Sequence, residues 1–184
     1  MLLSDPRLRF ARDLVAHWMR IRRVGLVPFE EDIDPRELVG AFPFITIADV
    51  SQPEAVQIEV VGSAIKRRYG QDTRKANWFD FVPPESRSAA EIARRLLVDA
   101  PCGVYYKIKV WRDPATVVEA ETLALPLRTR GAEIPDMSIA LTRDLSTTEL
   151  AEPASPAPPK LESVLTELVD IGAGLPGGFP TASP

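Results

Sequence analysis

The sequence predicts an α+β fold: a five-stranded antiparallel sheet with helices on one face, preceded by an N-terminal amphipathic helix. Three observations lead to this prediction. Residues 8–21 carry apolar side chains at helical spacing, residues 43–61 hold two β-prone runs, and residues 102–144 hold three more with only short turns between them. Because parallel neighbours need long crossovers, the last three strands should form an antiparallel meander, and the helices before them should cover the sheet.

The first helix is expected to begin at Pro6, which is pre-set for the first helical position, and to end near Gly25. Its apolar stripe consists of Leu8, Ala11, Leu14, Val15, Trp18 and Ile21. This helix precedes the minimal fold, and tryptophan is a residue type that anchors interfaces. We therefore predict that Leu14 and Trp18 form a dimer interface.

Two strands and three helical segments are expected between residues 28 and 98. Residues 28–40 read as a loop with a short helix, and residues 43–50 and 56–61 read as strands, the second with one buried face. Gly62 ends that strand, a short helix follows and stops at Gly70, and residues 86–98 form a longer amphipathic helix.

The meander is predicted over residues 102–111, 117–127 and 136–144, with turns at 112–114 and 131–135. Side chains alternate along a strand, so only one of the two sets on the first meander strand can be buried. Tyr106 and Ile108 should therefore point toward the helices, and Lys107 and Lys109 toward solvent.

The C-terminal part differs in composition from the rest. Four prolines between residues 151 and 160 indicate an extended linker, and residues 161–171 carry apolar side chains at the spacing of a short amphipathic helix, which we expect to dock onto this molecule. A glycine- and proline-containing end should be disordered. The predicted organisation is the N-terminal helix in 1–27, the folded domain in 28–146, and the linker, short helix and disordered end in 147–184.

Composition favours a protein of the cytoplasm. The 184 residues are 45% hydrophobic and carry a formal net charge of −4, which favours neither nucleic acid nor membrane insertion as the main interaction. Asp5, Pro6 and Arg7 interrupt the N-terminus before any export signal can form. A single cysteine, Cys102, fits a reducing compartment.

A set of residues in a fixed order resembles a bacterial family of single-domain PAS-like proteins. It covers about residues 10–145 and comprises Trp18, Arg22 or Arg23, Pro28, the turn Asp32-Ile33-Asp34-Pro35, Asp49, Gly62 with Ser63, Gly70 with Asp72, and Leu125-Pro126-Leu127. The resemblance implies a module that binds a small ligand, a cofactor or another protein, and it implies no catalytic chemistry.

In such a fold the ligand lies between sheet and helices. The candidate ligand-pocket residues are therefore Trp78, Phe81, Tyr106, Ile108, Ile139 and Leu141. The same side chains could equally fill a dry core.

No catalytic residue and no metal site is predicted, and the sequence names no cofactor. His17 is the only histidine and is interpreted as a surface or partly packed residue, and Cys102 as a small buried hydrophobe. Glu119 and Glu121 share a strand face and are interpreted as solvated side chains, because carboxylates paired for acid/base work usually come from different elements. Hydrolase, nucleotide-binding and zinc motifs are absent from the sequence.

Three functions remain open at this stage. The first is a stand-alone PAS-like sensory or adaptor module without a fused effector, which binds a small molecule, a protein partner, or both. The second is a structural interaction protein with a filled core and a homodimer made by the first helix. The third is a small enzyme on a related fold. The sequence identifies neither the ligand nor the partner.

Overall fold

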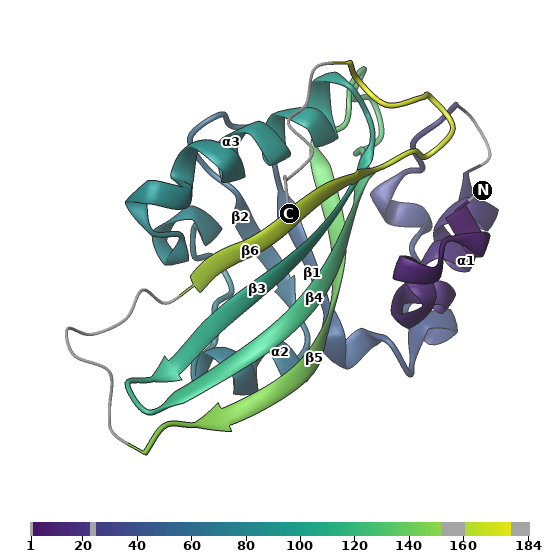
Figure 1. Ribbon diagram of the computed structural model, residues 1–184. Coiled ribbons are helices and arrows are strands. Elements are labelled where there is room, and N and C mark those ends of the chain that lie inside the picture. Colours follow the sequence, from purple (N-terminus) through teal and green to yellow (C-terminus); the bar gives the residue numbers. More distant parts are fainter. Residues whose placement is uncertain (1, 23–24, 152–160, 178–184) are drawn as a thin grey trace.

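A computed structural model describes residues 2–22, 25–151 and 161–177, with the backbone alone described at 163–165. Its centre is a six-stranded antiparallel sheet in the order β2-β1-β5-β4-β3-β6 (Figure 1). The strands are β1 (Ile45–Asp49), β2 (Gln57–Val61), β3 (Gly103–Asp113), β4 (Thr116–Leu127), β5 (Met137–Glu149) and β6 (Leu161–Val169). The helices are α1 (Arg12–Ile21), α2 (Ser63–Tyr69) and α3 (Pro84–Asp99), with short 3₁₀ helices between them.

Strands β1 to β5 confirm the five predicted strands and the antiparallel meander. Strand β4 pairs with β3 on one side and with β5 on the other, so that Thr122 lies opposite both Tyr106 and Thr142. Helices α2 and α3 cover one face of this sheet, and α1 with its neighbouring 3₁₀ turns covers the other (Figure 1). The result is the predicted α+β arrangement with an added N-terminal helix.

Strand β6 corrects the prediction of an amphipathic helix at 161–171. It pairs antiparallel with β3, from Leu161 opposite Val110 to Val169 opposite Gly103, and closes an edge that β3 would otherwise expose. The register shifts where Lys107 faces Leu165 and Ile108 faces Ser163, which leaves one extra residue on β6. Residues 152–160 of the linker predicted at 151–160, and residues 178–184 of the predicted disordered end, lie outside the described residues.

The N-terminal helix packs on its own sheet, which corrects the predicted dimer interface. Pro6–Ala11 forms a 3₁₀ helix, capped by the Asp5 carboxylate at the Arg7 amide, and α1 follows. Leu14 and Trp18 are both 0% exposed, and the Trp18 indole Nε1 donates a hydrogen bond of 2.9 Å to the Pro126 carbonyl. The apolar stripe covers a face of the sheet that would otherwise be in water, so neither side chain is available to a second molecule.

Gly62 allows α2 to begin directly behind the end of β2. Its amide donates a hydrogen bond of 2.8 Å to the Ile45 carbonyl. A Cβ atom at this position would overlap the backbone carbonyls of Phe42 and Pro43. Only glycine therefore lets the chain turn here without moving the start of β1.

Candidate functional site

A cavity of about 110 Å³ lies between the sheet and helices α2 and α3. Residues from the five strands β1 to β5 and from helices α2 and α3 line it, together with the turn before α3 that contains Trp78. The strand residues of the lining are Thr46, Ala48, Ile58, Val104, Tyr106, Ile108, Thr122, Ala124, Ser138, Ala140 and Thr142. The cavity therefore occupies the position between sheet and helices at which a ligand was expected.

The cavity exists because the sheet is covered by small side chains at this point. Ala124 and Ala140 face each other across β4 and β5, and Ser138 lies next along the same face. The opposite walls, from α2, α3 and the Trp78 turn, supply larger side chains but do not reach the sheet everywhere. A well-packed interior leaves few voids larger than a water molecule, so a hollow of this size is a specific feature.

Asn77 fixes the position of Trp78 at the cavity wall. Its side-chain Oδ1 accepts hydrogen bonds from the amides of Val56 (3.0 Å) and Phe79 (3.1 Å). The first bond ties the turn to the segment leading into β2, and the second caps the 3₁₀ helix Trp78–Phe81. The Trp78 ring then lies against Tyr106, with ring centroids 6.4 Å apart.

Two tyrosine hydroxyls belong to the polar groups of the cavity wall. The Tyr69 hydroxyl accepts a hydrogen bond from the Trp78 indole, and burial raises the Tyr69 pKa. Tyr106 shares a hydrogen bond with Thr122, whose Oγ1 donates to Thr142 Oγ1 at 3.0 Å, and burial likewise raises the Tyr106 pKa. Both phenols are therefore neutral at physiological pH and serve as hydrogen-bonding groups.

Two arginines of the wall are buried but differ in their partners. The Arg68 side chain is 1% exposed and forms an ion pair with Asp144, to which its Nε donates at 2.6 Å. Arg94 of α3 is 9% exposed, and one terminal nitrogen donates to the Val50 carbonyl at 2.7 Å. In the part of the chain that the structure describes, no carboxylate lies within ion-pair distance of Arg94.

Two polar atoms of the wall are buried without a hydrogen-bond partner among the described residues. They are the Oγ1 of Thr73, which is 1% exposed, and the Nε of Arg94. A buried donor that is left unpaired costs about 1–3 kcal/mol, and more when it is charged. Both atoms belong to residues that line the cavity.

The predicted ligand-pocket residues separate into three groups. Trp78, Tyr106 and Ile108 line the cavity. Phe81 is buried behind it, against the Tyr69 ring at 5.3 Å between centroids. Ile139 and Leu141 are a correction, since they lie on the other face of the sheet in the apolar cluster beneath α1. Alternation along β5 sends Ser138, Ala140 and Thr142 to the cavity and the two larger side chains away from it.

Arg68, Thr73 and Arg94 were not predicted as site residues. Arg94 did carry a signal in the sequence, because it lies four residues after Ala90 and three before Leu97, within the apolar stripe of the helix. An arginine at such a position must find a partner in the interior. Thr73 lies in the loop after α2 and carries no comparable pattern.

His17 and Glu121 are buried, contrary to the sequence interpretation. His17 Nε2 accepts a hydrogen bond of 3.2 Å from the Asp34 amide, and Nδ1 lies 2.9 Å from both Glu37 Oε2 and Arg20 Nη2. Burial, and then the charge of Arg20, lowers the His17 pKa.

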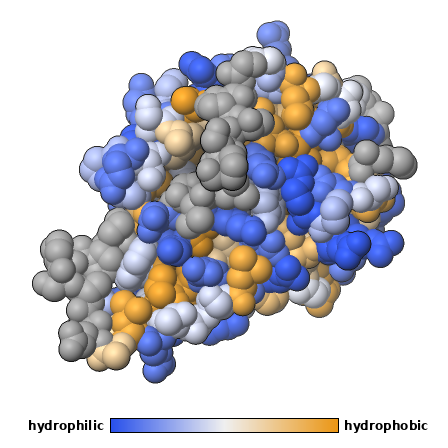
Figure 2. Space-filling view, in the orientation of Figure 1, coloured by the Kyte–Doolittle hydropathy of each residue, from blue (hydrophilic) through white to orange (hydrophobic). Residues whose placement is uncertain are grey.

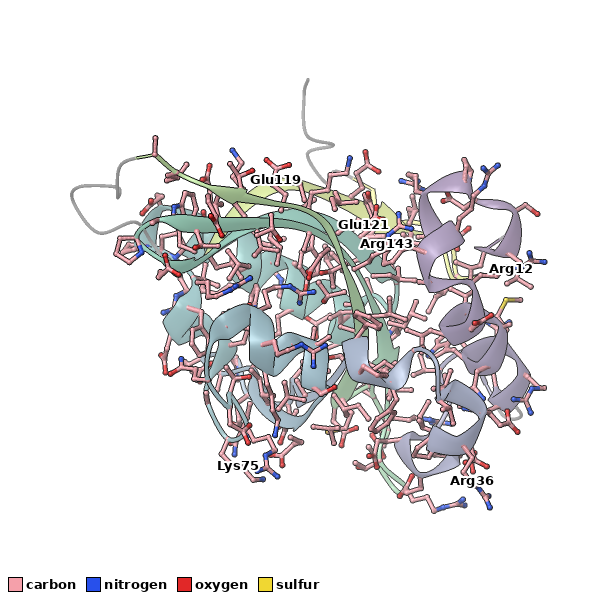
Figure 3. All side chains as sticks on the ribbon, turned by 90° about the horizontal axis from the view of Figure 1, so that it is seen from below. Arg12, Arg36, Lys75, Glu119, Glu121 and Arg143 are labelled. Carbon is pink, nitrogen blue, oxygen red and sulfur yellow. The ribbon has the colours of Figure 1, made fainter. Side chains whose placement is uncertain are left out.

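Glu121 lies on the sheet face toward α1, where it accepts a hydrogen bond of 3.0 Å from the Tyr105 hydroxyl and pairs with Arg143 (Figure 3). Burial, followed by the bond to Glu121, raises the Tyr105 pKa to about 12. Glu119, two residues earlier, is exposed as predicted. Cys102 is buried as predicted, and burial raises its thiol pKa to about 11.

The surface gives few indications of a partner. The face in Figure 2 is mainly hydrophilic with small apolar areas between. The large apolar side chains exposed among the described residues belong to separate segments: Leu3, Val39, Ile134, Leu145 and Leu175.

None of the described helices is long and apolar enough to cross a membrane. The described residues also contain no cluster of three or more histidine, cysteine or acidic side chains suited to a metal ion.

A family model agrees with this architecture. Residues 8–139 match a family model described as PAS domain. A LOV protein of Rhodobacter sphaeroides is similar in structure at 14% identity and a TM-score of 0.46, over 62% of this chain and 69% of that one. An RNA-binding light-oxygen-voltage receptor is similar at 24% identity and a TM-score of 0.45, over 66% of this chain and 36% of the receptor chain. No curated protein matches the chain.

Proposed function

The chain belongs to the PAS domain family, and from this premise we propose that it is a sensory or adaptor module. In this proposal a small molecule binds in the cavity between the sheet and helices α2 and α3, and a protein partner reads the bound state. The observation that carries the proposal is the cavity itself, an apolar hollow with a few converging polar groups, which is the usual character of a ligand site.

The size of the cavity restricts the ligand. At about 110 Å³ it is smaller than the roughly 150 Å³ cavity that binds benzene in an engineered protein, and well below the ~300–1,000 Å³ of sites for drug-sized molecules. A flavin or a haem would require the helices to move apart. We therefore propose a ligand of a few non-hydrogen atoms.

The composition of the wall supports binding without catalysis. Among the described residues that line the cavity there is no histidine, carboxylate or cysteine. The tyrosines have raised pKa values, and the arginines are charged at all relevant pH values, so the wall offers no general base near neutral pH.

Helix α3 is the element through which we propose that the bound state is passed on. The strands are held to one another by backbone hydrogen bonds, whereas α3 meets the sheet through side chains and the bond from Arg94 to Val50. A ligand that contacts Arg94 and Tyr106 would shift this helix more easily than any strand, and the exposed side of α3 would present the change to a partner.

The test is a variant that fills the cavity. Ala140→Leu adds three carbon atoms to the cavity floor, where the space can accept them, while Ala16→Leu on the exposed side of α1 is the matched control. Native mass spectrometry of freshly purified wild type and control should detect a retained small molecule, and the filled variant should be folded and empty. Equal retention by the filled variant would place the ligand elsewhere. Empty wild-type protein that also binds nothing from a library of small metabolites would favour a module with a filled core.

A further inference from the structure

We infer that the cavity takes a short-chain carboxylate whose charged end pairs with Arg94 and whose carbon chain occupies the apolar space below Trp78 and Tyr106. This inference rests on the proposed function, because it assigns a chemical class to the ligand of the same cavity. It is carried by one observation that the fold alone does not explain, namely a buried guanidinium without a counter-ion among the described residues.

Arg94 is nine-tenths buried and lines the cavity, yet only a neutral carbonyl, that of Val50, accepts a hydrogen bond from it. Its Nε is buried and unpaired. Arginine stays protonated in proteins, so the charge cannot be removed by a shift in protonation. A buried charge is normally paired, and the missing partner must therefore be an anion from outside the described chain.

Arg68 provides the internal comparison. It lines the same cavity and is even less exposed, but Asp144 neutralises it. Among the described residues a carboxylate thus neutralises one of the two buried arginines, and none neutralises the other, which also lines the cavity. A planar guanidinium matches the two oxygens of a carboxylate, to which it can donate two parallel hydrogen bonds.

The remaining wall limits what can follow the carboxylate. Ala124, Ala140 and Ile108 offer only apolar surface, and Thr73, whose hydroxyl has no partner among the described residues, belongs to the same wall. Since one water occupies about 30 Å³ of liquid, about 110 Å³ corresponds to roughly four non-hydrogen atoms of ligand. The four carbon atoms of butyrate match this number, with its carboxylate oxygens in contact with Arg94 at the wall, and butyramide is its neutral counterpart of nearly equal shape.

The experiment titrates butyrate and butyramide separately into ¹⁵N-labelled wild-type protein and follows the Arg94 Nε–H and Trp78 indole N–H signals by NMR. We expect butyrate to shift both signals with a dissociation constant of about 1 mM or below, a range open to a ligand of six non-hydrogen atoms. Butyramide should bind at least about tenfold more weakly, because hydrogen bonds to charged groups are stronger than neutral ones.

Two variants identify the residue. Arg94→Gln should weaken butyrate binding about tenfold or more and leave butyramide binding unchanged, whereas Arg95→Gln removes the same charge from the exposed side of α3 and should change neither. Arg94→Lys keeps a positive charge and should keep the preference for butyrate. If Arg94→Gln does not fold, Arg94→Lys still tests whether a positive charge at this position causes the preference for butyrate.

The inference is overturned if butyramide binds as tightly as butyrate and Arg94→Gln affects neither. It is also overturned if butyrate shifts only signals outside the cavity, or if neither probe binds at tens of millimolar. None of these results decides whether the cavity binds a ligand at all, because the cavity-filling variant tests that question with the retained molecule.

Discussion

Replacement of Trp18 tests whether the N-terminal helix belongs to the core of the domain. Trp18→Phe removes the indole donor and leaves the Pro126 carbonyl without it, which should cost about 1–3 kcal/mol, since both groups are buried. The smaller ring buries less apolar surface and leaves a void, for about 1–2 kcal/mol more. We therefore expect the free energy of unfolding to fall by about 2–5 kcal/mol, and for Trp18→Ala by at least about 3–5 kcal/mol.

The assay is urea unfolding followed by far-ultraviolet circular dichroism, which does not depend on the fluorescence of the replaced tryptophan. Arg12→Ala on the exposed side of the same helix is the control (Figure 3), and it should change the unfolding free energy by less than about 0.5 kcal/mol. Light scattering measures the molar mass of each variant in parallel. A Trp18→Phe protein of unchanged stability but lower molar mass would refute the reasoning and return this side chain to an interface.

Three further predictions concern other parts of the fold. Gly62→Ala should destabilise the domain by more than about 2 kcal/mol in urea unfolding, because the new Cβ would overlap the Pro43 carbonyl; a neutral effect would mean that this segment moves freely. His17 has a lowered pKa in the folded protein, so as the pH falls the unfolded chain binds the proton before the folded chain does. The contribution of His17 to the free energy of unfolding should therefore be constant above pH 6.5, and the free energy should decrease as the pH drops below that value. His17→Gln should remove this part of the pH dependence in thermal unfolding scans at pH 5–8, and an unchanged profile would contradict the assignment. Deletion of residues 152–184 should expose the edge of β3 and increase aggregation and dye binding, and a truncated protein that stays monodisperse would show that β6 does not protect this edge.

The first five strands along the chain, β1 to β5, could be predicted because each has a strong local sequence pattern. Alternation on β3 placed Tyr106 and Ile108 toward the helices correctly, as the cavity lining confirms. Ile139 and Leu141 were placed on the wrong face, because β5 is buried on both faces and directs its larger apolar side chains toward α1 and its smaller ones, Ser138, Ala140 and Thr142, toward the cavity.

The helix predicted at 161–171 was wrong for a physical reason. A β-bulge inserts one residue where β6 passes Lys107 and Ile108, so the side-chain alternation changes phase in the middle of the strand. Leu161 and Leu168, seven residues apart, consequently meet the same sheet face, which is the spacing of two helical turns. Only the pairing with β3 reveals the strand, and a single sequence does not contain that information.

The cavity could not be predicted from the sequence, for a different reason. A void is the absence of side-chain volume between elements that are distant in the chain, such as Ala124 and Ala140 below α3. Sequence patterns report which residues are buried, but they do not report whether the buried volumes add up to a filled interior.

The pairing of β6 with β3 also sets the order in which the chain can complete its fold during synthesis. Val110 cannot pair until Leu161 has been synthesised, 51 residues later, and Gly103 cannot pair until Val169 has been synthesised, 66 residues later. At a synthesis rate of about 5–20 residues per second, the edge of β3 would stand open for roughly 3–13 seconds. The nascent domain therefore passes through a stage in which five strands are present and one edge is free to pair with another chain.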